Sequence, residues 1–135
     1  MAILRQMKLL HKRASPVSAL TATAVLSKAL IRASRQLGLS NAQLAQVLGV
    51  SESSIHRLAA GQREVDPQSK EGELAALLVR LYRSLDAVVG ADAYLRQRWL
   101  TSHNHALNGT PLELIGSAAG LVHTVAYLDH ARAPL

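Results

Sequence analysis

Residues 39–67, LSNAQLAQVLGVSESSIHRLAAGQREVDP, predict two short helices joined by a tight turn. Ser40 and Gln43 form a capping-box pair, because the serine hydroxyl can accept from the Gln43 amide while the glutamine side chain reaches back to Ser40. We expect the first of these helices to begin after Ser40 and to end at Gly49, since glycine adopts the left-handed C-terminal conformation at the least cost.

The second helix of this stretch should begin after Ser51, run to about Ala60 and end at Gly61. Six small or apolar residues have the spacing that packs the two helices together: Leu44, Ala45, Leu48, Val50, Ile55 and Leu58. Ala45 must be small because the second helix crosses close to it, whereas Ile55 fills the angle between the helices. This spacing is that of a helix-turn-helix, whose second helix lies in the major groove of DNA.

The flanks of this stretch predict further helices, because leucine and alanine dominate and alternating β-branched patterns are absent. Residues 1–16 form a basic arm, and a first helix should cover residues 17–37 and stop at Gly38. Asp66 and Pro67 should start the helix that follows the quoted stretch, with the aspartate as its cap and the proline in its first turn.

Apolar residues then recur with heptad-like spacing from Leu74 to Val89, and Gly90 should close that helix. Such a stripe can be the core of its own domain or a seam to a second copy of the chain.

The last third of the chain predicts a helix around residues 91–100, a polar link over residues 101–109 and a helical hairpin that ends at about residue 131. Residues 110–113, Thr-Pro-Leu-Glu, form a second capping box with proline at the first helical position. The predicted fold class is therefore all-α.

Charge is unevenly divided along the 135 residues, whose net charge is +6. Residues 1–67 hold nine Lys/Arg and three Asp/Glu, whereas residues 68–135 hold six Lys/Arg and six Asp/Glu. All the aromatic residues also lie in residues 68–135. Affinity for DNA is chiefly electrostatic, so the basic half is the candidate for DNA binding. Its lack of aromatic residues argues against single-strand binding by base stacking.

The absence of cysteine excludes disulfides, thiolate zinc sites and cysteine nucleophiles, and fits a reducing cytosol.

Residues 39–63 closely resemble the lambda-repressor-like (Xre-type) helix-turn-helix family. The resemblance implies a helical bundle over residues 17–67 that binds double-stranded operator DNA. It implies contacts from the exposed face of the second helix and its flanks: Gln43, Glu52, Ser53, Ser54, His56, Arg57 and Arg63. Arg57 could grip a guanine through two hydrogen bonds, Glu52 could accept from a cytosine, and Arg63 could hold a phosphate. The alternative is that these residues are only the solvated face of a surface helix.

The last third of the chain carries a second resemblance. Its residues are Trp99-Leu100, Asn104-x-Ala106-Leu107-x-Gly109, the run Thr110-Pro111-Leu112-Glu113-Leu114-Ile115, and Gly120. Together they look like the toxin-binding domain of the MbcA/ParS/Xre antitoxins, which implies a helical dimerisation and toxin-binding domain over residues 68–135. With the upstream motif, the chain looks like the Xre antitoxin that pairs with a RES-domain toxin. That family implies a toxin that consumes NAD or transfers from it, neutralisation by direct contact, and repression of the operon promoter.

Toxin contacts are expected at Trp99 and in the tail after the last helix, at Arg132, Pro134 and Leu135. A toxin pocket that binds a dinucleotide must offer hydrogen-bond donors to phosphate oxygens. The carboxylate of Leu135 could take the position of a phosphate there and block the toxin's active site. Pro134 would limit the entropy that the tail loses on insertion. The alternatives are a frayed terminus for the tail and a place in the core for Trp99.

Neither catalysis nor a bound metal or other cofactor is expected. His123 and His130 lie seven residues apart on a predicted helix, too far for one ion, and His103 and His105 have no nearby carboxylate to complete a ligand set.

Repressors of this type bind as dimers because two half-sites match a two-fold axis. We therefore expect a cytoplasmic homodimer without a membrane segment that also forms a hetero-oligomer with the toxin. A stand-alone dimeric regulator and a small histidine-dependent hydrolase are the rival hypotheses.

Overall fold

The computed structural model describes residues 22–132, which contain helices, turns and an isolated antiparallel bridge between Asn104 and Gly109. The first helix is described over residues 22–36. The helices after it are α2 (Asn41–Leu48), α3 (Glu52–Ala59), α4 (Lys70–Val89), α5 (Ala93–Thr101), α6 (Pro111–Leu114) and α7 (Ala118–Arg132). The all-α prediction is confirmed, while the predicted basic arm, the start of the first helix and the tail lie outside the described residues.

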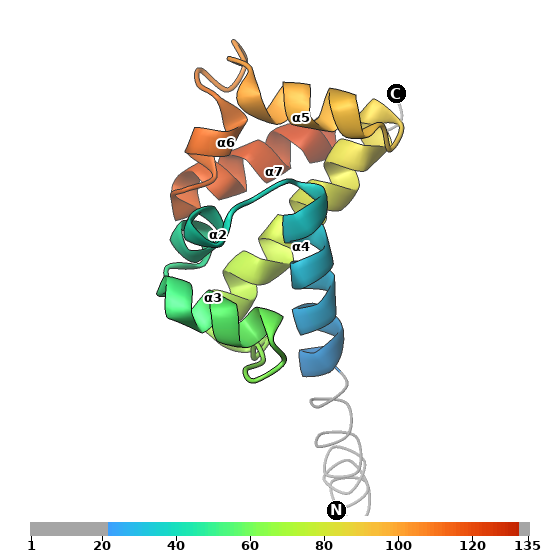
Figure 1. The fold of residues 1–135 in the computed structure, drawn as a ribbon. Coiled ribbons are helices and arrows are strands. Elements are labelled where there is room, and N and C mark those ends of the chain that lie inside the picture. Colours follow the sequence, from blue (N-terminus) through green and yellow to red (C-terminus); the bar gives the residue numbers. More distant parts are fainter. Residues whose placement is uncertain (1–21, 133–135) are drawn as a thin grey trace, which may run out of the picture.

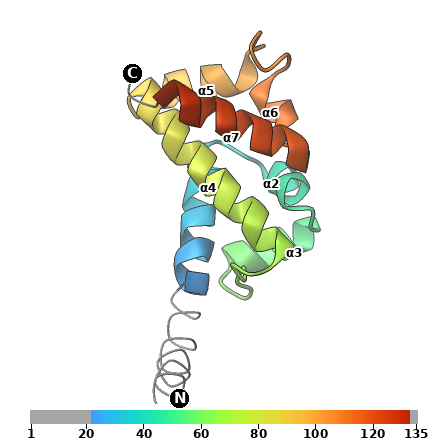
Figure 2. The ribbon, with the colours of Figure 1, turned by 180° about the vertical axis from the view of Figure 1, so that it is seen from behind.

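Helix α4, with 20 residues, runs diagonally across the molecule (Figure 1). The first helix, α2 and α3 lie beside its first half, and α5 and α7 lie at its second half, while α6 contacts α5 and α7. The reverse view shows α7 packed against α4 (Figure 2), which is the most extensive contact between two of the labelled helices. One long helix therefore supports both the helix-turn-helix and the C-terminal helices.

A single cluster of buried residues joins the two halves of the chain. Its fully buried large members come from both halves: Leu30, Leu37, Ile55, Leu78, Leu81, Leu85, Leu100, Ile115, Leu121 and Leu128. Burying each such side chain stabilises the fold by about 1.5–3 kcal/mol. Leu78, Leu81 and Leu85 of α4 are fully buried within the chain, so these three members of the heptad-like stripe belong to the core of the chain itself.

The predicted ends of α2 and α3 are confirmed. The Ser40 hydroxyl accepts from the Gln43 amide at 3.1 Å, and Gln43 Oε1 accepts from the Ser40 amide at 2.8 Å, so both halves of the capping box form. Gly49 ends α2 with a φ of 69°, in the left-handed region that favours glycine. Ser51 caps α3 by accepting from the Ser54 amide at 3.2 Å.

The predicted start of α4 at Asp66 and Pro67 is wrong. Ser69 is the cap, and its hydroxyl accepts from the Gly72 amide at 3.0 Å. The Asp66 carboxylate instead accepts from the Gln68 amide at 2.9 Å, which folds residues 66–69 into a turn before the helix. A Cβ at Gly72 would lie 2.1 Å from the Asp66 carbonyl oxygen, so a glycine there lets the turn pack onto the first helical turn.

The second predicted capping box, at residues 110–113, is also wrong, although Pro111 does occupy the first turn of α6. The Glu113 amide, which should bind the Thr110 hydroxyl, binds the Thr110 carbonyl oxygen at 3.0 Å. The Thr110 side chain makes no capping hydrogen bond, and α6 ends after only four residues.

Candidate nucleic-acid interface and partner surface

Helices α2 and α3 pack together as the sequence predicts. The inward residues Leu44, Ala45, Leu48, Ile55 and Leu58 are all at most 5% exposed. Val50 is half-buried at the corner, and its amide donates to the Ala45 carbonyl at 3.0 Å. The two helices therefore hold a fixed angle, which is the requirement for presenting the second one to a DNA groove.

The outer face of α3 is open to solvent. Glu52, Ser53, His56 and Arg57 are exposed. Ser54 is half-buried, and its hydroxyl lies 3.0 Å from the Ser51 hydroxyl and accepts from Arg57 Nη2 at 3.2 Å. Ser54 therefore positions the Arg57 guanidinium, which retains donors that can reach a base edge.

Gln43 and Arg63, two further expected DNA contacts, already bind within the chain. Gln43 is half-buried and caps α2. Both Nη atoms of Arg63 donate to the Glu71 carboxylate at 2.5 Å, in the bidentate geometry of a strong pair. The hydrogen bond to Glu71 raises the pKa of Arg63 above its usual value. Arg63 thus ties the loop after α3 to the start of α4, and a phosphate would compete with Glu71 for its donors.

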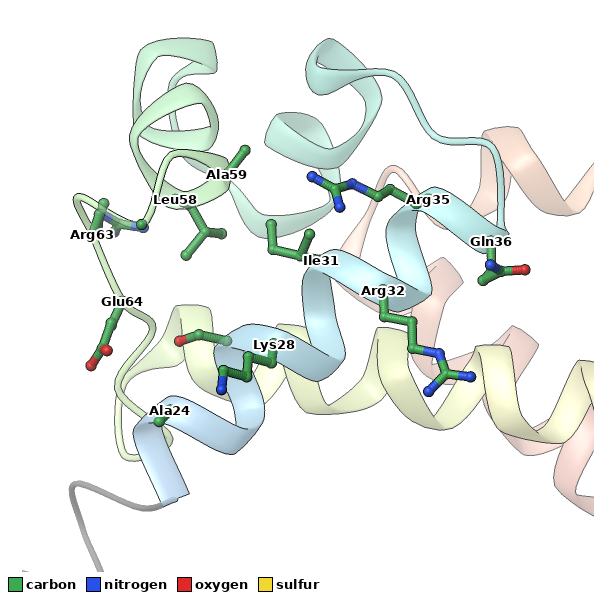
Figure 3. A pocket seen from close by; sticks show the side chains of 12 residues that line it. Ala24, Lys28, Ile31, Arg32, Arg35, Gln36, Leu58, Ala59, Arg63 and Glu64 are labelled. Carbon is green, nitrogen blue, oxygen red and sulfur yellow. The ribbon is translucent and has the colours of Figure 1, made fainter.

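The described part of the first helix carries a basic face that sequence reasoning missed. Lys28, Arg32 and Arg35 are exposed and line a groove of about 560 Å³ between this helix and the end of α3. Figure 3 shows Lys28, Arg32 and Arg35 along the helix and Arg63 with Glu64 on the opposite wall. The spacing of these three cations, four and then three residues apart, is the pattern that could have found them.

The C-terminal motif residues are mostly structural. Leu100, Leu107, Pro111 and Ile115 are buried. Trp99 is half-buried and stacks on Tyr127 with ring centroids 6.4 Å apart. Its side chain therefore packs against the core, which was the alternative to a toxin contact for this residue.

The glycines and Asn104 of the same motif shape the link between α5 and α7. The Asn104 side chain accepts from the Leu107 amide at 3.0 Å, and its backbone pairs with Gly109. A Cβ at Gly120 would lie 1.9 Å from the carbonyl oxygen of Leu114. Only glycine lets the end of α6 approach α7 this closely.

A buried arginine on α5 links the two halves of the chain, and the sequence analysis missed it. Arg96 is 5% exposed, its Nε donates to Asp86 of α4 at 2.8 Å, and its Nη1 donates to the Gln36 carbonyl of the first helix at 3.0 Å. Its guanidinium also lies 5.5 Å from the centre of the Tyr82 ring. Next to it, Gln97 Nε2 donates to the Leu37 carbonyl at 2.9 Å.

Large apolar side chains are exposed on either side of the turn that joins α4 and α5. Val88 is 44% exposed, Tyr94 68% and Leu95 45%. We call Val88, Tyr94 and Leu95 the α4–α5 corner. Both views place the end of α7 beside this corner (Figures 1 and 2). Val88 belongs to the heptad-like stripe, which the sequence left open between a core and a seam, and its exposure excludes it from the core of this chain.

A partly buried network of charged and polar groups joins the end of α7 to α4. Arg132 Nη1 donates to the Ser84 hydroxyl at 3.1 Å, and that hydroxyl donates to Asp129 at 2.7 Å. Asp129 also pairs with Arg80 at 2.5 Å. The hydrogen bond from Ser84, followed by Arg80 and Arg132, lowers the pKa of Asp129 below its usual value. Pro134 and Leu135 lie outside the described residues.

The described part of the chain contains neither a cluster of metal ligands nor a membrane-spanning helix. The rings of His103 and His105 lie 5.0 Å apart, edge to face. Within residues 22–132, no three His, Cys, Asp or Glu side chains are grouped so that they could hold a metal ion. No helix in that range is long and apolar enough to span a lipid bilayer.

The fold and the exposed α3 face define a helix-turn-helix protein of the DNA-binding class. Residues 16–80 match the family described as the antitoxin Xre-like helix-turn-helix domain, and residues 84–133 match the antitoxin Xre/MbcA/ParS C-terminal toxin-binding domain. The chain therefore carries the two domains of an Xre-type antitoxin, and the two matched ranges meet within α4. Neither family is generally enzymatic. No curated protein matches the chain.

Proposed function

We propose that this antitoxin neutralises a NAD-consuming RES-domain toxin by direct binding and represses its own operon. The support for a RES partner is the resemblance of the Trp99–Ile115 segment to antitoxins of that class. The observation that carries both activities is the placement of two exposed surfaces near opposite ends of α4: the polar outer face of α3 and the apolar α4–α5 corner. The role requires no catalytic step from this chain.

The operator contacts that we propose lie on α3. Arg57, positioned by Ser54, pairs with a guanine, and Glu52 discriminates by accepting from a cytosine. Ser53 and His56 complete the exposed face, while Gln43 and Arg63 contribute by holding the ends of the motif in place. Because its operator is duplex DNA, we propose that the protein acts in the cytoplasm. It binds as a homodimer, with one recognition helix in each half-site.

The toxin contact that we propose is the α4–α5 corner together with the adjacent end of α7. The motif residues of this domain are largely buried, so they build the domain and leave the contact to its exposed side chains. Tyr94 and Leu95 offer apolar area that binding would remove from water, and tyrosine and arginine are the residue types that contribute most at protein interfaces. Arg132, with Pro134 and Leu135 beyond it, extends this surface toward the toxin's active site, while Trp99 supports it from the core.

The test is purification of the tagged chain together with the RES-domain toxin encoded beside it, followed by NAD hydrolysis at increasing antitoxin concentration. Tyr94→Ala with Leu95→Ala should raise the antitoxin concentration needed for half-inhibition by about thirtyfold or more, the loss expected for an interface hot spot. Val122→Ala, on a 53% exposed valine of α7, is the matched control and should leave inhibition unchanged.

Two outcomes would contradict this proposal. Full inhibition by the Tyr94/Leu95 variant would show that the α4–α5 corner is not part of the toxin interface. Failure of the toxin to copurify with the unaltered chain would contradict the assignment of a RES-domain partner. Removal of residues 133–135 separately tests Pro134 and Leu135, and should weaken inhibition while DNA binding stays intact.

A further inference from the structure

The recognition face of α3 has no net charge of its own. Its exposed charged residues are Glu52 and Arg57, which cancel. Affinity for duplex DNA comes largely from cations that neutralise phosphates. Arg63, the phosphate contact that the sequence suggested, is paired with Glu71. A helix-turn-helix of this composition therefore needs its phosphate contacts elsewhere.

The groove beside α3 has the required charge. Lys28, Arg32 and Arg35 line it, against one acid, Glu64, so the lining carries a net charge of about +2 once Arg63 is paired with Glu71. Among residues 22–132, none of these three cations has an ion-pair partner within 4.0 Å. Phosphate binding would therefore break no ion pair of the described residues, unlike binding at Arg63.

The groove is also continuous with the recognition helix. Leu58 and Ala59 of α3 line the groove together with Ile31 of the first helix (Figure 3). The groove thus begins at the edge of the helix that we propose to enter the major groove, which is where a DNA strand bordering that groove would run.

We propose that this groove binds the sugar-phosphate backbone of one DNA strand through Lys28, Arg32 and Arg35, while α3 contacts the bases. The inference rests on the proposed DNA binding by α3 and assigns its phosphate contacts. The three cations span about 10 Å along one face of the first helix. One DNA strand presents about three phosphates over that axial length. Arginine binds phosphate oxygens in bidentate fashion and lysine binds them as a point charge.

The experiment measures binding to a duplex taken from upstream of the operon, and to a random duplex of equal length, over a series of salt concentrations. The variant is Lys28→Gln with Arg32→Gln and Arg35→Gln. The matched control is Lys70→Gln with Arg83→Gln and Arg98→Gln, which removes one lysine and two arginines at exposed positions of α4 and α5 that do not line the groove. Thermal unfolding verifies that both variants are folded, and glutamine is a good helix former at all six positions.

The groove variant should lose affinity for both duplexes, and the slope of log K against log salt should become shallower by up to about 2.7, at about 0.9 for each lost phosphate contact. The control variant should keep most of the slope of log K against log salt that the unaltered chain shows. An unchanged slope in the groove variant, or an equal change in the control, overturns the groove as a phosphate site.

The same experiment separates this inference from the function on which it rests. If the unaltered chain binds neither duplex at low salt, both the DNA-binding proposal and the groove are wrong. If the chain binds and Arg57→Gln weakens only the upstream duplex, the DNA-binding proposal stands, and the groove variant alone decides the inference. If the groove variant changes toxin inhibition and leaves the salt slope as it was, the groove serves a protein partner and the inference is wrong.

Discussion

The helix-turn-helix and the C-terminal helices use their motif residues in opposite ways. In α3, the residues that set the helix angle are buried and the residues expected to bind lie exposed beside them, as with Ile55 and Arg57. In the C-terminal half, residues such as Leu100 and Ile115 are buried, and Gly120 allows the end of α6 to approach α7 closely. A sequence motif can therefore include an exposed face in one domain and consist mostly of buried scaffold in the other.

The largest effect is expected where the two halves are joined. Arg96→Met should lower the free energy of unfolding by about 3–5 kcal/mol, because it leaves Asp86 and the Gln36 carbonyl without their buried partner. Urea unfolding followed by circular dichroism measures the loss. Arg98→Met, an exposed arginine on the same helix, should change stability by less than about 0.5 kcal/mol. Equal effects of the two changes would show that Arg96 is not the link between the halves.

The scaffold role of the C-terminal motif is tested at a glycine. Gly120→Ala should destabilise by about 3 kcal/mol, near the upper end for overpacking, because the new methyl group meets the backbone carbonyl of Leu114. Ala119→Ser, at the exposed neighbouring position, should be nearly neutral. Thermal unfolding measures both. A normal midpoint for Gly120→Ala would mean that the close approach of α6 to α7 is dispensable.

The binding role of the α3 face is tested by an exposed change that should spare the fold. Arg57→Gln should weaken binding to the upstream duplex by about 2 kcal/mol, the cost of one bidentate base contact, and leave unfolding unchanged. Fluorescence anisotropy with the upstream and random duplexes measures the difference. Loss of affinity for both duplexes in equal measure would assign Arg57 to a phosphate instead of a base.

The smallest effect is a pH dependence at the end of α7. The folded chain holds the pKa of Asp129 below its unfolded value, so the stabilisation is present above about pH 4, the ordinary aspartate value, and is lost as pH falls through the lower folded pKa. Asp129→Asn should remove up to about 1 kcal/mol at neutral pH, as expected for a partly exposed pair with Arg80. It should also flatten the decline below pH 4. An identical acid decline in the variant would assign that decline to other carboxylates.

The local prediction succeeded best where neighbouring residues decide the structure. The capping box of Ser40 and Gln43 and the turn at Gly49 follow from residues three or four positions apart, and they form as expected. The same type of pattern failed at residues 110–113, where the Glu113 amide binds the Thr110 backbone instead of its side chain. A capping pattern states which hydrogen bonds are available, and the surrounding chain selects among them.

The candidate binding residues divide in the same way. The exposed face of α3 could be predicted, because helical periodicity fixes which residues oppose Ile55 and Leu58. The pairing of Arg63 with Glu71 and the burial of Arg96 could not, since each partner belongs to another element of the chain.

By itself, the sequence determined that this protein is helical, that residues 40–61 form a helix-turn-helix, and which side of α3 faces outward. Those features rest on hydrogen bonds and side-chain spacing within a few residues. Only the tertiary structure decided that Leu78, Leu81 and Leu85 of α4 are core, that Trp99 packs on Tyr127, and that Arg96 bonds the first helix across sixty residues of sequence. Burial and ion pairing depend on which distant segments meet, and a linear pattern does not contain that information.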